Sequence, residues 1–306
     1  MSGDIPRISV MVITYNQEDV IRRTLDSLLR QKEWLYEICI NDDCSTDRTW
    51  EILQEYASCW PDLVKPVRND HNLGIFENTE TVWKRPAGDL VYDLAGDDEC
   101  GDGFFREVIA FIRNKGIDWK NELFCVYGDY RMINPDGSSI VYRQKLVNDH
   151  NALKLKTRKL LSTRAACFSK KVLDKFEPVS QGRSYNAELA QDCQLQLFSE
   201  HNYYIPVVGN VYYARIGVSA SMSGDDAWQN VFGAFDRYLD FLGSHGVTLD
   251  SRDIAFIDYM KAYRGGDVKR MAIKYLQGID FSLGLEGLQL RRVFFVLFHR
   301  LLKKKK

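Results

Sequence analysis

The chain has 306 residues, of which 45% are hydrophobic and 27% charged, and its 41 basic residues are balanced by 42 acidic ones. This is the composition of a globular protein with one large domain or two modest ones, and it excludes a disordered, collagen-like or low-complexity chain. Because the formal net charge is only −1, no overall basic field attracts nucleic acid, and we expect no nucleic acid partner.

The cysteines and the amino terminus indicate a cytoplasmic protein. Seven cysteines are scattered along the chain and never form a CxxC pair, which is typical of free thiols in a reducing compartment. The segment Met1–Asn16 lacks the pattern of a signal peptide, and no apolar run reaches the roughly 18 residues that a membrane span needs. We therefore expect the protein to stay in the cytoplasm.

The first half of the chain alternates between short apolar runs and segments with helical periodicity. The apolar runs predict strands at Ile8–Ile13, Tyr36–Ile40, Leu63–Val67, Asp89–Leu94 and Phe124–Tyr127. The periodic segments predict helices at Glu18–Arg30, Arg48–Tyr56, Ile75–Lys84 and Phe104–Asn114. Asp47 is the expected N-cap of the second helix. This alternation predicts an α/β fold with a mostly parallel sheet flanked by helices.

The second half of the chain gives weaker strand signals and then only helical ones. A turn at Asn134–Gly137 predicts a hairpin that continues into Ser138–Tyr142, and the polar stretch Arg143–Thr157 is expected to be a loop. Further strands are expected at Ala165–Phe168, Tyr203–Val208 and Val211–Ile216, and helical segments at Lys170–Phe176 and Ala187–Glu200. After Ser219 every periodic segment is helical. We expect a domain at residues 1–220 and a helical C-terminal region at 221–306.

Three polar clusters follow predicted strands, at Thr14–Asn16, Asn41–Asp47 and Gly96–Glu99. In an open parallel sheet, ligands bind outside the carboxyl ends of the strands, so we expect the three clusters to meet at one site. The adjacent acids within them repel one another unless a cation or a donor-rich ligand neutralises them, and oxygen ligands suit Mg²⁺ or Mn²⁺. Each cluster alone could also be a solvated turn with a helix cap, but their coincidence favours a binding site.

Four segments resemble the family 2 glycosyltransferases of the GT-A fold, in the order and spacing of that family. They are Ile8–Asn16 (ISVMVITYN), Ile40–Thr49 (INDDCSTDRT), Asn72–Gly74 (NLG) and Gly88–Asp98 (GDLVYDLAGDD). The resemblance extends over residues 6–216. It implies a Rossmann-like GT-A catalytic domain in which a nucleotide-diphosphate sugar, above all a UDP-sugar, lies across the strand ends.

The resemblance also implies which residues bind this donor. Those that line the nucleotide are Thr14, Tyr15 and Asn16. Those that take its base and ribose are Asp42 and Asp43. Those that shape the same pocket form an N-x-G-x-x-x-N variant, Asn72, Gly74 and Asn78.

The metal motif of the family is D-x-D, and its first position here is Ala95, followed by Gly96 and Asp97. The first acid is therefore missing, although a GDD version of the motif is familiar within the family. The resemblance implies that Asp97 still binds the cofactor, Mn²⁺ or Mg²⁺, next to the donor diphosphate.

Inverting sugar transfer needs a carboxylate that takes the proton of the acceptor hydroxyl while its oxygen attacks the anomeric carbon. The family often carries an E-D pair that opens a helix after the core sheet, and Gln191-Asp192 matches it with Gln in place of Glu. The resemblance thus implies Asp192 as the catalytic base, with Glu188, one helical turn away, as the alternative. Either acid could instead be an ordinary surface acid. Arg215 could reach the diphosphate or simply end a strand.

The predicted function is that of a metal-dependent inverting hexosyltransferase that moves a sugar to a hydroxyl of a glycan or lipid-linked acceptor. The resemblance implies surface polysaccharide biosynthesis as the setting, and the absence of a Q-x-x-R-W motif favours one sugar per encounter. The alternative is a degenerate nucleotide-sugar-binding protein without turnover, which Ala95 and Gln191 favour. Asp97 and Asp192 argue against that alternative. A nucleotidyltransferase is disfavoured, because no glycine-rich phosphate loop follows the first predicted strand.

The end of the chain has a charge of its own. Residues 288–306 carry seven basic residues and no acid, which leaves a formal charge of −8 on the rest. Their apolar residues follow helical spacing and form one stripe: Leu290, Val293, Phe294, Leu297 and Leu301. A basic amphipathic helix of this kind lies in the interface of an anionic membrane, so we expect peripheral contact with the inner face of the cell membrane. The same stripe could instead pack on the protein or on a partner subunit.

Overall fold

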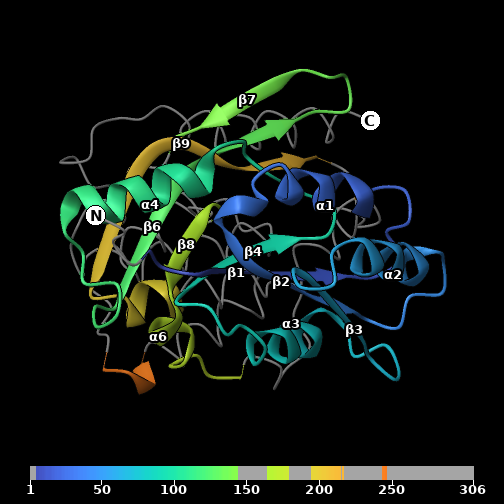
Figure 1. Cartoon of the computed structure of the whole chain (residues 1–306), viewed down its shortest axis with the longest axis horizontal. Coiled ribbons are helices and arrows are strands. Elements are labelled where there is room, and N and C mark those ends of the chain that lie inside the picture. The colour runs from blue at the N-terminus through green and yellow to red at the C-terminus, as the bar shows by residue number, and fades with distance from the viewer. Residues whose placement is uncertain (1–4, 144–163, 179–193, 215, 217–242, 247–306) are drawn as a thin grey trace, which may run out of the picture. The chain divides into compact units, whose positions relative to one another are not determined.

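The computed structural model of the protein describes residues 5–143, 164–178, 194–214, 216 and 243–246 (Figure 1). All of these except 243–246 belong to one compact unit. The predicted domain boundary near residue 220, the C-terminal helices and the basic segment 288–306 lie outside the described residues and stay predictions. The helix predicted at Ala187–Glu200 is described only in part, and residues 194–198 are helical there.

A sheet runs through this unit, and its first four strands are parallel. Strands β1 and β2 pair with each other, β3 extends the sheet beyond β2, and β4 lies on the other side of β1 (Figure 1). Their bounds are Ile8–Thr14, Leu35–Asp42, Val64–Arg68 and Leu90–Ala95. The four predicted strands of this region are confirmed, and each observed strand extends one or two residues further toward its carboxyl end.

The sheet becomes mixed beyond β4. Its full order is β3-β2-β1-β4-β8-β6-β9-β5, with β7 paired to β6. Strand β8 is antiparallel to both β4 and β6, whereas β9 is parallel to β6 and antiparallel to β5. The bounds of these strands are Glu99–Cys100 for β5, Phe124–Ile133 for β6, Ser139–Tyr142 for β7, Ala166–Ser169 for β8 and His201–Tyr213 for β9. The fold is thus mixed α/β, with its parallel part confined largely to β1–β4.

Strand β9 is one long strand where the sequence predicts two. The two predicted strands, Tyr203–Val208 and Val211–Ile216, leave Gly209-Asn210 between them. In the structure, Gly209 lies inside the strand, and a Cβ atom on it would lie 2.8 Å from the Cβ of Ala165 and 2.7 Å from the ring of Phe104. The glycine therefore serves a close approach between β9 and its neighbours, and the strand continues through it.

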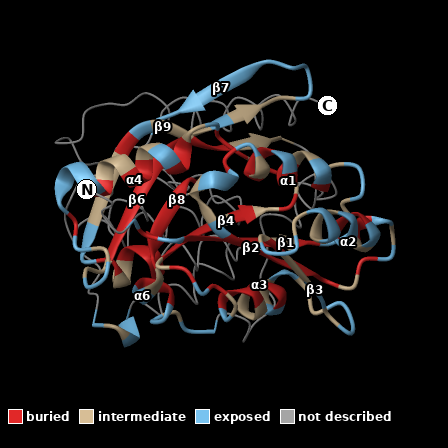
Figure 2. Cartoon of the chain, in the orientation of Figure 1, coloured by how far each residue is buried: buried red, intermediate tan, exposed pale blue. Residues whose placement is uncertain are grey.

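Helices cover both faces of the sheet, and the period-2 alternation of the strands decides which residues face which layer. Ile8, Val10 and Val12 of β1 pack in one cluster with α1, α2 and α4, whereas Met11 packs in a second cluster with α3 and α6. The helices are α1 Ile21–Leu29, α2 Thr49–Cys59, α3 Ile75–Trp83, α4 Phe104–Lys115 and α6 Lys170–Leu173, and a short 3-10 helix spans Lys32–Trp34. Figure 2 shows strands β1, β2, β4, β6 and β8 as a mostly buried layer between these helices, whereas β7 is exposed.

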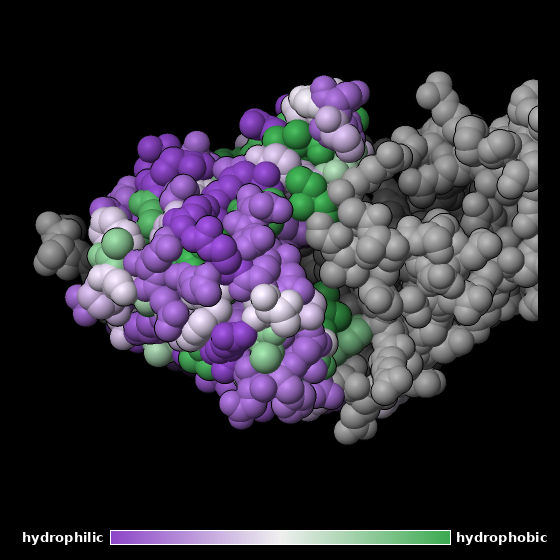
Figure 3. All heavy atoms as spheres, turned by 90° about the vertical axis from the view of Figure 1, so that its right-hand side faces the viewer, coloured by the Kyte–Doolittle hydropathy of each residue, from purple (hydrophilic) through white to green (hydrophobic). Residues whose placement is uncertain are grey.

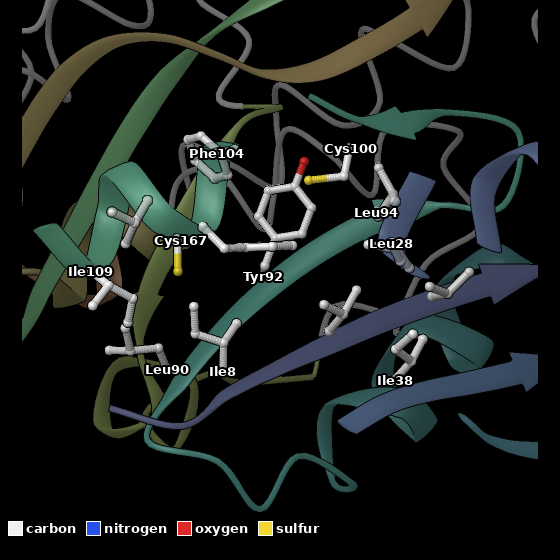
Figure 4. Packing of buried hydrophobic residues seen from close by; sticks show 14 of the residues in the cluster. Ile8, Leu28, Ile38, Leu90, Tyr92, Leu94, Cys100, Phe104, Ile109 and Cys167 are labelled. Atoms are coloured by element: carbon white, nitrogen blue, oxygen red, sulfur yellow. The ribbon is translucent and has the colours of Figure 1, made fainter. Parts of the chain in front are cut away.

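Aromatic packing anchors the first cluster. The ring of Tyr92 on β4 lies 5.5 Å from the ring of Phe104 on α4 (Figure 4) and 5.2 Å from that of Phe105 on the same helix. The hydroxyl of Tyr92 donates to the carbonyl of Gly209 at 2.6 Å, which satisfies its only polar group. Burial raises the pKa of this phenol well above its ordinary value. Tyr92 thus links the parallel strands to β9 and stays protonated.

One buried acid, Glu37 of β2, is satisfied inside the fold. It accepts hydrogen bonds from the Ser9 hydroxyl at 2.8 Å, the Ala87 backbone N–H at 2.6 Å and the Lys65 ammonium at 2.9 Å. Burial alone raises the pKa of this carboxyl, but the three hydrogen bonds outweigh burial and lower the pKa below its ordinary value of 4.5. Glu37 is therefore a charged structural residue at neutral pH.

Within the described ranges, six cysteines are free thiols and no helix has the length and apolar character that a membrane crossing requires. The free cysteines are Cys39, Cys44, Cys59, Cys100, Cys125 and Cys167. Cys193 lies outside the described residues. Burial raises the pKa of Cys39 and of Cys100 to about 12, so these two thiols stay protonated in the core.

Candidate active site

The three polar clusters meet at the carboxyl edge of the parallel strands. In the register of the sheet, Thr14 of β1 lies opposite Asp42 of β2, and Ile13 lies opposite Ala95 of β4. The backbone N–H of Asp43 donates to the Thr14 carbonyl at 2.9 Å, and that of Gly96 donates to the Ile13 carbonyl at 3.0 Å. The arrowheads of these strands point to the right in Figure 1, and Figure 3 shows that side, where the described surface is mostly hydrophilic.

The loop after β1 is fixed by the loop after β2. Asn16 has a left-handed backbone, with φ of 49°, and its side-chain oxygen accepts the backbone N–H of Thr46 at 2.8 Å. Its own backbone N–H donates to the Ser45 hydroxyl at 2.9 Å. Thr14 is buried, whereas the side chain of Tyr15 is 44% exposed. Of the three residues expected to line the nucleotide, Tyr15 and Asn16 are thus exposed and Thr14 is buried.

The N-cap residue of α2 is Arg48 rather than the predicted Asp47, and the Arg48 side chain makes no capping hydrogen bond, but Asp47 directly before it still binds the helix end. The Asp47 carboxylate accepts the backbone N–H of Thr49 at 2.9 Å, in the first turn of α2, and the N–H of Glu18 at 3.1 Å. In return, the Glu18 carboxylate accepts the N–H of Arg48 at 2.9 Å. The exposed amides of this helix end are therefore satisfied by acids from two loops, which locks the edge of the candidate site.

Asp42 ends β2 and is fully buried. Its carboxylate accepts from the backbone N–H of Ser45 at 3.2 Å and from the Ser45 hydroxyl, and the Arg68 guanidinium lies 3.3 Å away. Burial is the largest influence on this carboxyl and raises its pKa above the ordinary value, although Ser45 and Arg68 favour the charged form. Arg68 ends β3 and is a functional candidate that the sequence analysis missed.

Asp43 holds the following loop. One carboxylate oxygen accepts from the Asn69 amide and the Leu73 backbone N–H, both at 2.8 Å, and the other accepts from the Gly74 backbone N–H at 2.8 Å. Gly74 has a φ of 82°, a backbone conformation that strongly favours glycine. Asp43 is buried, so three of its roughly four acceptor positions are taken by its own chain.

The other members of the N-x-G-x-x-x-N variant divide between the interior and the surface. Asn78 of α3 is buried, and its side-chain oxygen accepts from the Asn69 amide at 2.9 Å. Its own amide donates to the Asn41 carbonyl at 3.4 Å. Asn72 is exposed. Asn78 therefore supports the 69–74 loop from within, while Asn72 lies on its outer side.

The acidic segment after β4 begins with a tight turn. The backbone N–H of Asp98 donates to the Ala95 carbonyl at 3.1 Å, so Gly96 and Asp97 are the two central residues of a four-residue turn. A Cβ atom on Gly96 would lie 2.3 Å from the side-chain oxygen of Gln17 and 3.0 Å from the Ile13 carbonyl. Gly96 is thus the residue type that lets this turn pack directly against the end of β1.

The three acids of this segment have different surroundings. Asp98 is buried, with one carboxylate oxygen 3.3 Å from both the Arg164 guanidinium and the Asn210 amide. The Glu99 carboxylate lies 3.3 Å from the Arg30 guanidinium and accepts from the Tyr213 hydroxyl. Asp97 is half-buried, at the centre of the turn. Asp98 and Glu99 are therefore ion-paired parts of the fold.

A metal at this edge of the sheet would have to be held mainly by its substrate. In the part of the chain that the structure describes, no group of three or more His, Cys, Asp or Glu side chains is arranged to hold a metal ion. Mg²⁺-type sites commonly use one or two carboxylates together with substrate phosphates, so a single acid at the strand ends meets that requirement. Asp97, which the resemblance implies as the metal ligand, would be that acid.

Four candidates of the sequence analysis cannot be placed. Asp192, its neighbour Gln191, the alternative Glu188 and Arg215 lie outside the described residues. The described residues that the sequence analysis missed are arginines, Arg23, Arg68 and Arg164. Arg68 ends a strand beside Asp42, so the rule that singled out the polar clusters could have found it.

The chain belongs to Glycosyl transferase family 2, whose sequence profile matches residues 9–163. An uncharacterized protein of Mycobacterium tuberculosis is 38% identical over 133 residues, which are 43% of this chain and 37% of that protein. Chondroitin synthase of Pasteurella multocida is 31% identical over 137 residues, 44% of this chain and 13% of that protein. The similarity thus spans less than half of each of these relatives.

Solved structures show the same fold at low sequence identity. TarS of S. aureus, residues 1–349 in complex with UDP-GlcNAc, superposes with a TM-score of 0.58 and 19% identity over 95% of this chain and 79% of that one. The mannosyltransferase PcManGT of Pyrobaculum calidifontis, in complex with GDP-Man and Mn²⁺, has a TM-score of 0.55 and 15% identity over 90% of this chain and 74% of that one. The predicted GT-A fold is confirmed.

Proposed function

We propose that the protein is an inverting glycosyltransferase that transfers a single hexose from a UDP-sugar to a hydroxyl of a glycan or lipid-linked acceptor, in surface polysaccharide biosynthesis. The observation that carries the proposal is the convergence of Thr14, Asp42 and the turn of Asp97 at one edge of the parallel strands. Family membership supports sugar transfer, and the similarity to chondroitin synthase supports a polysaccharide product.

The donor nucleotide would bind across the ends of β1 and β2. The residues proposed to form its binding site are Thr14, Tyr15, Asn16, Asp42, Asp43 and Asn72. Gly74 and Asn78 would act by shaping the 69–74 loop, since the Gly74 N–H donates to Asp43 and the Asn78 side-chain oxygen accepts from the Asn69 amide. A preorganised loop lowers the entropy cost of binding.

Asp97 would hold Mn²⁺ or Mg²⁺ beside the donor diphosphate. When bound, such an ion supplies positive charge that stabilises the departing diphosphate. The solved structure of PcManGT with GDP-Man and Mn²⁺ supports this role for a metal in a protein of the same fold. Because Ala95 replaces the first acid of the motif, Asp97 would be the main protein ligand.

Asp192 is proposed as the general base, with Glu188 as the alternative. The acceptor hydroxyl would lose its proton to the carboxylate while its oxygen forms a bond to the anomeric carbon. The bond from that carbon to the diphosphate breaks on the opposite face, and the diphosphate leaves with the electron pair. The result is inversion without a covalent enzyme intermediate.

We further propose that residues 288–306 bring the protein to the cytoplasmic face of an anionic membrane. Each basic residue near such a surface contributes about 1 kcal/mol, and seven basic residues are present. A lipid-linked acceptor presents its sugar at that surface, so the tail would raise the local concentration of acceptor.

The test is release of nucleotide from a panel of UDP-, GDP- and dTDP-sugars, with Mn²⁺, with Mg²⁺ and with chelator. Wild type should release UDP faster with metal, and Asp97→Asn should lower turnover at least ~100-fold while leaving the fold intact. Asp62→Asn is the matched control, because Asp62 is an exposed acid just before β3, at the opposite edge of the sheet.

Nucleotide-sugar binding without turnover in wild type would favour the degenerate binding protein instead. Near-normal turnover in Asp97→Asn would exclude Asp97 as the metal ligand.

A further inference from the structure

Two neighbouring residues of α1, Arg23 and Thr24, donate hydrogen bonds to backbone carbonyls of the turn that contains Asp97. The Arg23 guanidinium donates to the Asp97 carbonyl at 2.7 Å. The buried Thr24 hydroxyl lies 2.8 Å from the Gly96 carbonyl and 2.7 Å from the Asp98 carbonyl, and it donates to one of them at a time. Three successive carbonyls are thus held by one turn of a helix.

Arg23 is itself held in place. Its guanidinium carbon lies 3.5 Å from the centre of the Tyr213 ring, and its Nε lies 3.5 Å from the Glu99 carboxylate. The Tyr213 hydroxyl donates to the same carboxylate oxygen of Glu99. Burial and Glu99 together raise the pKa of Tyr213 to about 12, so the phenol keeps the proton that it donates. The arginine is therefore clamped between a ring, a carboxylate and the Asp97 carbonyl.

This arrangement suits a positioning role better than a role in stability alone. A hydrogen bond from a guanidinium is charge-assisted and directional, and it acts on the main chain of the residue whose carboxylate is proposed to bind the metal. Because Ala95 replaces the first acid of the D-x-D motif, the carboxylate of Asp97 would have to bind the ion without the second carboxylate that the full motif provides. Small displacements of such a group are costly, since metal ligands need a rigid support.

We propose that Arg23 is a positioning residue for metal binding, which fixes the backbone of Asp97 so that its carboxylate meets the ion and the diphosphate. This inference rests on the proposed function, in which Asp97 is the metal ligand. It predicts that loss of the Arg23 contact weakens metal binding and leaves nucleotide binding without metal unchanged.

The experiment measures Mn²⁺ affinity by calorimetric titration of the full chain saturated with UDP, and UDP affinity separately in the presence of chelator. Arg23→Met should weaken Mn²⁺ binding about tenfold or more, the usual effect of losing an outer-shell partner. Its UDP affinity with chelator should stay within about twofold of wild type. Arg30→Met is the matched control, because Arg30 is the C-cap residue of α1 and pairs with the same Glu99 but otherwise binds Asp102.

Arg23→Lys is the second variant, to be used if Arg23→Met does not fold. A lysine keeps the charge but lacks the planar fork, so we expect at least a threefold loss of Mn²⁺ affinity. Equal Mn²⁺ affinities of the folded Arg23 variant and Arg30→Met would overturn the positioning role. If wild type binds UDP but no Mn²⁺, the metal site at Asp97 fails, and this inference fails with it.

Discussion

Asp43→Asn tests whether Asp43 builds the site through the 69–74 loop. An asparagine oxygen can still accept from the Asn69 amide and the Leu73 N–H, but its amide group then faces the Gly74 N–H, which is also a donor. Hydrogen bonds to a charged group contribute about 1.5–3 kcal/mol, against about 0.5–1.5 kcal/mol for neutral ones. One bond is lost and two are weakened, so we expect a loss of about 3–5 kcal/mol.

The assay is thermal unfolding, with Asp70→Asn as the matched control. Asp70 is an exposed acid in the same loop, so its substitution makes the same change of charge without the buried contacts. At roughly 2–4 °C per kcal/mol for a unit of this size, Asp43→Asn should lower the midpoint by at least about 6 °C. The double mutant Asp43→Asn with Asn69→Ala should lose less than the sum of the two single mutants. A midpoint within about 2 °C of that of Asp70→Asn would refute this reasoning.

Three further predictions follow from the proposed chemistry and from the buried acids. Asp192→Asn should abolish transfer and leave UDP-sugar affinity unchanged, because the base acts on the acceptor. If donor affinity collapses while some turnover remains, Asp192 is a structural acid and Glu188 is the base to test next. Glu37→Gln should cost about 1–3 kcal/mol of stability at pH 7. Because the folded pKa of Glu37 lies below its ordinary 4.5, this difference from wild type should persist above pH 4.5 and close as the pH falls through the folded pKa, as unfolding midpoints across pH 3–8 would show. A chain that ends at Glu286 should lose salt-sensitive co-sedimentation with anionic vesicles, and equal partitioning of truncated and full-length protein would remove the membrane role.

The parallel half of the sheet could be predicted because its signal is local. Strands β1, β2 and β4 are largely apolar runs followed by polar residues, and burial on both faces explains why these runs do not alternate strictly, whereas the edge strand β3 is only partly buried. The same locality places Asp42 and the turn of Asp97 at strand ends, and parallel pairing then brings the ends together. The clustering of these residues could therefore be expected, although their binding roles could not be tested.

The mixed half could not be predicted because its determinants are non-local. The two-residue strand β5 exists only through its pairing with β9, and its segment Glu99-Cys100 has no strand signal of its own. Gly209 separates the two predicted strands, whereas in the structure its small size serves the packing of Phe104, which is far away in sequence. The role of Arg23 has no local signal beyond its place in a predicted helix, because its partners come from β5, β9 and the Asp97 turn.

The structure also changes the reason for expecting a metal. In the sequence, the crowding of acids at the strand ends suggested that a cation must neutralise them. In the fold, protein donors already meet four of these acids: Asp42, Asp43, Asp98 and Glu99. Their crowding therefore needs no external cation. The case for a metal rests instead on Asp97, whose backbone is held from α1 at the centre of a turn, at the edge where a donor diphosphate would lie. This is why the metal affinity of variants that alter the Asp97 backbone, rather than the total acidity of the site, is the more informative measurement.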